Sequence, residues 1–426
     1  MRRTLSRLLA GTMLSACAAL PALAQDSSPY ATPSDDADVV VINQVTLGNV
    51  FANMNVVVDD YASDAEVIAT ATGNTSTAST LDNDIDYDAT QTQSGSVSAS
   101  TSLTGGTVYG DGASTVTTAY GNAASSHSEN GRTFHRATQE SNADVTAYSE
   151  IDLLVVDDVD ATTTAAGNVS NHTNLYGDNR GFQQQTGNAN VYATTTATFD
   201  SIDDSGRFGS VATGNNHSAT GSTSTSYTGV VQRMADSTEV AAFTEAYAGY
   251  GEDVAVGATA SGNSTEVNNE WGFATLGRDG SAVSQYNGAE IAADTSLTLT
   301  NWTGFSGATS YGVGNSALVS NIGSDTQMFV NQNNQGYVQT TASFDGGASD
   351  GSIGYASATS IGNAATATLC RTCGDNPVLS GSTNQVNGND VSAYGYVNSG
   401  FNGSAYGAAT AVGNSATYQS ISTSDD

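Results

Sequence analysis

Lysine is absent from this 426-residue chain, and its ten arginines face 42 acidic residues, so the formal net charge is −32. A nucleic-acid-binding surface is therefore excluded, because neutralising phosphates requires clusters of basic side chains. Only four residues are proline and 12% are charged, whereas 8% are aromatic, which argues against a wholly disordered chain. Large aliphatic side chains are also few. Several thick cores are excluded, but a thin core repeated many times is not.

Long apolar runs are missing as well, so no helix is expected to span a membrane. Residues 1–24 have the parts of a secretory signal peptide, namely a basic start, a short apolar stretch and Ala22-Leu23-Ala24 before the cleavage point. We therefore expect an exported chain that begins at Gln25. Leu14-Ser15-Ala16-Cys17 also matches a bacterial lipobox, so lipidation at Cys17 is the alternative.

Two interleaved series of residues recur at intervals of 46 to 53 residues. One is a Gly-Asn pair, and the other is a Gln that is followed six places later by Val or Ile in seven of eight cases. The glycines are Gly73, Gly121, Gly167, Gly214, Gly262, Gly314, Gly362 and Gly413, and the glutamines are Gln44, Gln91, Gln139, Gln185, Gln232, Gln285, Gln332 and Gln385. This spacing predicts eight repeats of about 48 residues.

Side chains alternate with a period of two within each repeat, as they do in a strand. Two places before each Gly-Asn pair nothing larger than alanine occurs, except for one serine, which indicates a closely packed interior column. We predict an all-β, elongated β-solenoid over residues 44–419, with a flexible leader and first strand at 25–43 and a tail at 420–426. The Gln side chains are then able to stack into an amide ladder along the axis.

The number of coils per repeat is open from the sequence. Further Gly-Asn pairs at Gly48, Gly187 and Gly388 favour two coils per repeat, and one wide coil is the alternative. Two coils predict about 16 levels and a rod of roughly 75 Å.

Only three cysteines occur, and one of them, Cys17, lies in the leader. Cys370 and Cys373 fall in a lengthened repeat of an exported chain, which favours a disulfide between them. Zinc binding lacks two further ligands nearby in the sequence, and a redox pair lacks its usual βαβ context. We therefore expect no metal site and no cofactor at this pair.

The alternating residues Asp82, Asp84, Asp86 and Asp88 resemble a calcium loop. Tyr87 stands where such a loop needs glycine, so a solvated acidic turn is the favoured interpretation. Catalysis is not expected, because the seven arginines after residue 24 are scattered and no Ser-His-Asp or Cys-His set stands out.

The pattern of Gln, five residues and then Val-x-Ala, with Gly-Asn between, resembles the curlin-like repeats of secreted amyloid adhesins. With its signal peptide and its Cys-x-x-Cys segment, nearly the whole chain resembles the holdfast anchor protein D family of stalked bacteria. The resemblance implies a cell-surface protein that acts with a curlin-like companion and an outer-membrane secretion pore. It supplies no catalytic residues.

The first functional hypothesis is therefore a non-enzymatic structural adhesin. It would be a homo-multimer on the outer membrane that anchors an adhesive extracellular polysaccharide, the holdfast, at the cell pole. The alternative is a self-assembling, curli-like fibre subunit of an adhesive matrix. The two hypotheses differ in whether the ends of the repeat stack are capped or add further copies.

Overall fold

A computed structural model describes residues 37–278, 282–371 and 376–421 of the chain. These residues are almost entirely β-strand, and none of them forms a helix, so the prediction of an all-β fold is confirmed. None of the described residues offers a helix long and apolar enough to cross a membrane. Residues 1–36, which include the predicted signal peptide and Cys17, lie outside the described residues.

Every coil of the chain contains one short strand. These short strands form one parallel sheet. Each spans nine residues, except in one coil, where two shorter strands take the place of one. They are β1 (Asp38–Thr46), β3 (Ile85–Gln93), β5 (Thr133–Ser141), β7 (Asn179–Gly187), β9 (Ser226–Met234), the divided strand β12 (Ala274–Leu276) and β13 (Val283–Asn287), β16 (Thr326–Asn334) and β19 (Leu379–Asn387).

A long stretch of strand follows each short strand and folds back on itself. It is continuous in β2 (Val50–Leu81), β4 (Val97–Glu129), β6 (Val145–Leu175) and β8 (Val191–Ser222). In later coils it is divided into β10 (Glu239–Glu252) and β11 (Val254–Glu270), β14 (Glu290–Thr303) and β15 (Phe305–Ile322), β17 (Val338–Ser349) and β18 (Ile353–Cys370), and β20 (Val391–Asn398) and β21 (Ser404–Ile421). We call the part before the point where the chain turns back the front segment, and the part after it the rear segment.

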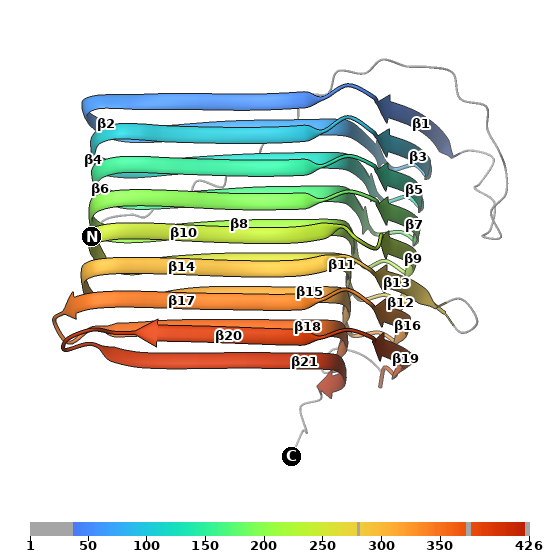
Figure 1. Ribbon diagram of the computed structural model, residues 1–426. Coiled ribbons are helices and arrows are strands. Elements are labelled where there is room, and N and C mark those ends of the chain that lie inside the picture. Colours follow the sequence, from blue (N-terminus) through green and yellow to red (C-terminus); the bar gives the residue numbers. More distant parts are fainter. Residues whose placement is uncertain (1–36, 279–281, 372–375, 422–426) are drawn as a thin grey trace, which may run out of the picture.

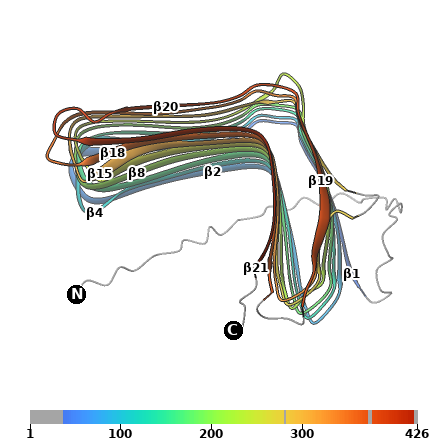
Figure 2. The ribbon, with the colours of Figure 1, turned by 90° about the horizontal axis from the view of Figure 1, so that it is seen from below.

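The coil is L-shaped in cross-section (Figure 2). Front and rear segments form the two layers of a long limb, and the end of the rear segment packs against the short strand in a short limb. Successive coils lie on top of one another (Figure 1). At most of the divisions between front and rear segments the chain adopts a positive φ, as at Asp253, Gly304 and Gly351.

Each strand pairs in parallel with its equivalent 46 to 53 residues further along the chain. The expectation of two coils per repeat is therefore wrong, because two coils require partners about 24 residues apart. Gly48, Gly187 and Gly388 lie at the corner where a short strand ends, so they mark no additional coil. Eight levels at the usual strand spacing give a height of about 35 Å, not 75 Å.

The core continues through the coils as columns of equivalent side chains. The predicted column of small residues lies at the elbow of the L, where Ala71, Ala119, Ala165, Ala212, Ala260 and Ser360 are at most 2% exposed. Large apolar side chains, including Leu103, Phe199, Trp302 and Phe344, fill the long limb. Adding a Cβ to Gly73 would place it 2.5 Å from the carbonyl oxygen of Gly121, so coils approach too closely there for any side chain.

Corners after the rear segments require a left-handed backbone. Positive φ occurs there at Asp82, Asn130, Tyr176, Thr223, Trp271, Gly323 and Asn376. Asp, Asn and Gly tolerate this conformation, whereas Tyr, Thr and Trp seldom adopt it. The corner is therefore imposed by the pairing of the flanking strands.

Candidate functional site

The eight predicted Gln residues lie in one continuous ladder inside the short limb. Seven hydrogen bonds of 2.8 Å link them, and in each the Nε2 of one Gln donates to the Oε1 of the Gln in the preceding coil. The other N–H of each Nε2 donates to a backbone carbonyl of the rear segment at 2.7 to 2.9 Å. The ladder thus joins coil to coil and layer to layer.

A second ladder, of asparagines, runs beside it in the opposite direction. The Asn of each Gly-Asn pair donates from Nδ2 to the Oδ1 of its equivalent in the following coil, at 2.7 to 2.9 Å. In the sequence these asparagines were identified only as part of the repeating Gly-Asn pair. The regular spacing of Asn74, Asn122, Asn168, Asn215, Asn263, Asn315, Asn363 and Asn414 was the signal that predicts the ladder.

A groove of about 460 Å³ crosses the corners between short strands and front segments. It spans several coils, so its lining comes from positions that are far apart in the sequence. The residues are Asn190, Tyr192, Ser237, Thr238, Glu239, Gly288, Glu290, Gln335, Gly336, Tyr337 and Asn389. Two phenol rings, two carboxylates and several amides therefore share one open, polar concavity, and sequence analysis did not predict it.

Carboxylates are held close together in this groove. Glu239 on β10 is the direct register partner of Glu290 on β14, a placement that is unfavourable for two like charges. The Tyr192 hydroxyl donates to Glu239 Oε2 at 2.8 Å, and burial together with this carboxylate raises the pKa of Tyr192 to about 12. The Tyr192 hydroxyl therefore stays protonated at neutral pH, and the paired glutamates favour a cationic or hydroxyl-rich ligand.

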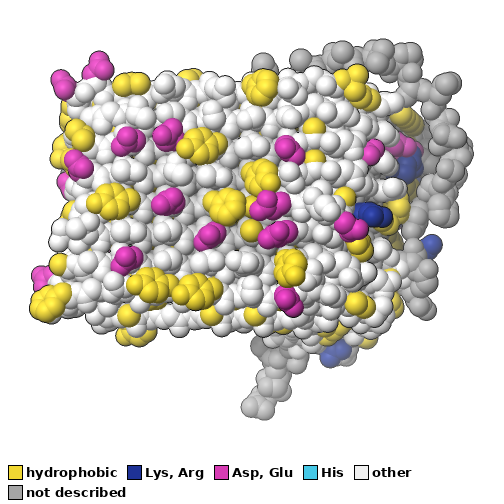
Figure 3. Space-filling model, in the orientation of Figure 1, with side chains coloured by type: hydrophobic (Ala, Val, Ile, Leu, Met, Phe, Trp, Pro, Cys, Tyr) yellow, Lys and Arg dark blue, Asp and Glu magenta, His cyan; other side chains and the backbone are white. Residues whose placement is uncertain are grey.

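We call the outer surface of the front segments the front face. Like the groove, it carries aromatic rings and acidic side chains (Figure 3). Exposed rings such as Tyr148 and Tyr247 alternate along the strands with acids such as Glu150 and Glu245. No front segment contains an arginine, since the described arginines occur on short strands, rear segments and corners. The front face is therefore acidic and aromatic, without a basic side chain to neutralise it.

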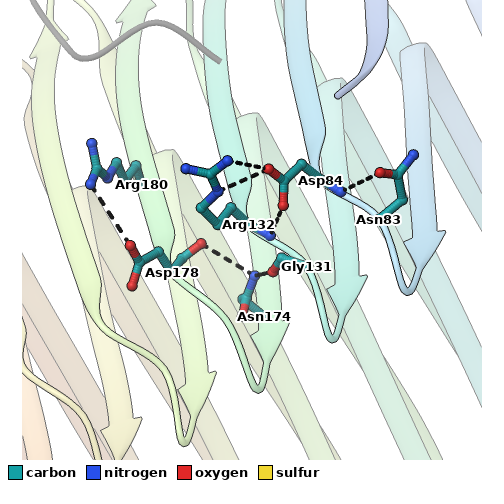
Figure 4. Close-up of polar contacts among 7 residues, drawn as sticks. All are labelled: Asn83, Asp84, Gly131, Arg132, Asn174, Asp178 and Arg180. Atoms are coloured by element: carbon teal, nitrogen blue, oxygen red, sulfur yellow. Dashed lines mark hydrogen bonds and ion pairs between the residues drawn. The ribbon is translucent and has the colours of Figure 1, made fainter. Parts of the chain in front are cut away.

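The four aspartates that resemble a calcium loop are paired with other side chains. Asp84 lies 2.6 Å from Arg132 of the next coil (Figure 4), and Arg136 contacts Asp86 at 2.9 Å and Asp88 at 3.3 Å. Asp82 accepts a hydrogen bond from Asn130 at 2.8 Å. Burial raises the pKa of Asp86, which Arg136 opposes. Among the described residues no group of three or more acidic, His or Cys side chains is arranged to hold a metal ion.

Figure 4 also shows how backbone and side chains share this corner. The Asn174 amide donates to the Gly131 carbonyl at 2.8 Å, and Arg180 lies 3.8 Å from Asp178. Polar contacts of this kind connect three successive coils.

The predicted disulfide joins Cys370 and Cys373. Cys370 is the last residue of β18, and Cys373 lies outside the described residues, so the pairing stays a prediction.

Three histidines form a buried stack with Tyr87 in the short limb. Ring centroids of Tyr87, His135, His172 and His217 follow one another at 4.8, 5.1 and 5.1 Å. His135 contacts Ser126 and Ser170, whereas the ring nitrogens of His172 have no hydrogen-bond partner among the described residues. The rings come from β3, β5, β6 and β8 without a common spacing, so no sequence signal predicts the stack.

Comparison with known proteins gives one match. A family model described as holdfast attachment protein D matches residues 22–180 and 59–337, two overlapping segments that together cover most of the chain. No curated protein and no solved structure was found to match. The likeness to curlin-like repeats stays a prediction.

Proposed function

Because the chain belongs to the holdfast attachment protein D family, we propose that it is a structural adhesin that ties an adhesive polysaccharide to the outer membrane at the cell pole. Family membership indicates a cell-surface or exported protein. We further propose that the stacked coils are a β-solenoid of eight repeats, which acts as a rigid support and not as an enzyme. A curlin-like surface protein and a secretion pore are the partners that the family resemblance implies.

The front face is the observation that carries this proposal. Tyrosine rings offer apolar platforms with a polar edge, and the intervening carboxylates and amides are suited to hydroxyl and amine groups of a sugar. Lacking arginine, this face attracts a polymer with free amines and repels an acidic one. Weak contacts repeated over several coils then add up through multivalency.

The proposal is tested by retention of a fully acetylated and a partly deacetylated amino-sugar polymer on the purified mature protein. We expect preferential retention of the partly deacetylated polymer, weakening with salt because exposed charges are screened over about 8 Å at physiological ionic strength. Equal retention of both polymers, insensitive to salt, would remove the electrostatic account and leave tyrosine stacking or a protein partner as the anchor.

Paired variants locate the binding site on the molecule. Glu239→Gln with Glu290→Gln keeps the groove's shape and its hydrogen bond to Tyr192 but removes two charges, and we expect retention to fall several-fold. The control, Glu129→Gln with Glu270→Gln, removes the same charge at the ends of rear segments, outside the front face. If both pairs weaken retention equally, net charge and not the groove determines binding.

A further inference from the structure

The two ends of the stack expose what the inner coils bury. Within residues 37–421, as far as the structure describes them, the first coil (β1 and β2) and the last coil (β19 to β21) each pair with a neighbouring coil on one side only (Figure 1). Core columns reach both ends and finish in half-buried residues, for example Val50 at one end and Val391 at the other. Strand edges of this kind are templates for pairing with another chain.

We propose that a second copy of this chain stacks on the end of the first, with the last coil of one copy pairing in parallel with the first coil of the next. The Gln385 of one copy would lie beside the Gln44 of the other, and Asn414 beside Asn74. The contact gives the structural adhesin proposed above the open ends expected of a fibre subunit, so the two functional hypotheses are combined here. It is independent of any ligand on the front face.

The Gln ladder leaves complementary groups at the two ends. At the first coil, Gln44 Nε2 donates to the Thr75 carbonyl, and among the described residues no earlier Gln accepts its second N–H. At the last coil, Gln385 donates to Gln332 and Ser415, and its Oε1 has no donor among the described residues. One end thus presents a donor and the other an acceptor, in the same column.

The Asn ladder has the opposite polarity, which makes the match more specific. Asn414 accepts from Asn363 at 2.7 Å, and its own Nδ2 has no partner among the described residues. At the other end, the Thr46 hydroxyl is the one donor to Asn74 Oδ1 within the described part of the chain, at 2.8 Å. A head-to-tail contact therefore continues both ladders at once, with every donor placed against an acceptor.

The two end coils also match in length. Val50 lies six places after Gln44, and Val391 lies six places after Gln385. From that valine to the Gly-Asn pair the interval is 23 residues in the first coil and 22 in the last. Corners and columns of the two coils therefore superimpose within one residue, as neighbouring coils inside the stack do.

The strands of the last coil lack the features that normally prevent edges from pairing. Natural edge strands are protected by charged side chains or proline. β19, β20 and β21 contain no charged residue and no proline, although the whole chain carries a net charge of −32. Exposed aromatic residues are present instead, among them Tyr394, Phe401 and Tyr406 at 60 to 75% exposure. The strands at this end therefore oppose no like charge to an acidic partner such as the first coil.

A head-to-tail contact joins two different surfaces, so it does not close on itself and generates linear stacks. The mature chain is examined by sedimentation velocity over a range of concentrations and by electron microscopy. We expect a series of species that lengthens with concentration along the stacking axis. A chain that stays monomeric throughout, or that stops at a dimer, would overturn the proposal.

Charge placed at the ends provides the decisive variants. In the proposed register the outward residues Asn43 and Asn384 become neighbours, as do Asn53 and Tyr394. Changing all four to Asp sets like charges opposite each other in both limbs, and we expect the association constant to fall about tenfold. Arg at residues 43 and 53 combined with Asp at 384 and 394 should restore it.

The control carries the same four charges in the same outward columns but inside the stack, as Gln184→Asp, Asn331→Asp, Thr194→Asp and Thr341→Asp. It should associate like the unmodified chain. If the end variant and this control lose association equally, or if the Arg-Asp combination fails to restore it, the contact is not the head-to-tail stack.

Discussion

His172 illustrates how a single buried side chain is able to set the pH response of this protein. Burial lowers the pKa of His172 to about 3 and holds the pKa values of His135 and His217 well below the usual range. All three rings are therefore neutral in the folded chain at mildly acidic pH, whereas the unfolded chain protonates them near pH 6.5. The folded state binds fewer protons in that interval.

Acidification is consequently expected to destabilise the fold. Above about pH 6.5 the rings are neutral in both the folded and the unfolded chain, so the histidines add no pH dependence to the free energy of unfolding. As the pH falls from there towards 3, each buried histidine lowers the free energy of unfolding by up to about 1.4 kcal/mol per pH unit. The measurement is urea unfolding between pH 7.5 and 4.5.

His172→Leu isolates this contribution. The substitution also changes packing and therefore the absolute stability of the variant, so the readout is the slope of the free energy of unfolding against pH. This slope should be shallower in the variant than in the unmodified chain by up to about 1.4 kcal/mol per pH unit. Aspartates and glutamates titrate in both proteins and cancel in the difference. Identical slopes would mean that His172 is protonated in the folded state.

The two amide ladders hold the short strands to the rest of each coil. Gln185 on β7 shares hydrogen bonds with Gln139, Gln232 and the Asn216 carbonyl, and its side chain is fully buried. A buried polar group that loses its partner costs about 1–3 kcal/mol, so an interruption of the ladder affects several groups at once.

Gln185→Leu should therefore lower the free energy of unfolding by more than about 3 kcal/mol, because three partner groups are left unsatisfied. Gln184→Leu is the matched control, since residue 184 is the exposed neighbour on the same strand, and it should cost within about 0.5 kcal/mol. Chemical denaturation of both variants provides the comparison. Similar losses would show that the ladder contributes no more than an exposed position.

The shape of the whole molecule concentrates its negative charge. One coil per repeat makes a broad slab about 35 Å high, and its front face carries acids without arginine. Arg132, Arg136 and Arg180 form close ion pairs with acids, but the whole chain has ten basic residues against 42 acidic ones, so most carboxylates face no basic partner. Self-repulsion of the remaining carboxylates therefore opposes the compact state.

Sodium chloride is expected to raise the urea midpoint of unfolding, because screening weakens repulsion between acids more than it weakens the few ion pairs. The effect should level off as the Debye length falls to about 3 Å near 1 M salt. Chloride is preferred to sulfate, which strengthens apolar burial in any protein. A midpoint that falls with sodium chloride would mean that attractive pairs dominate the electrostatics.

The repeat period, the all-β class and the inward columns were all predictable from the sequence. In a parallel, in-register stack each residue lies beside its equivalent in the next coil, so the period along the chain becomes a column in space. Ala165 and its equivalents show this, because their small size repeats with the strand pairing. The same reasoning identified the Gln ladder, and with Asn168 and its equivalents it would have identified the Asn ladder.

The path of each coil was decided by tertiary packing. A period near 48 residues is the same for one wide coil and for two narrow ones, and alternation along a strand does not reveal where that strand folds back. The choice depends on which inward faces fill the space between two layers, as Phe199 and Trp302 do in the long limb. The groove around Glu239 and the histidine stack of His172 followed from that choice, because their members come from different coils and different layers.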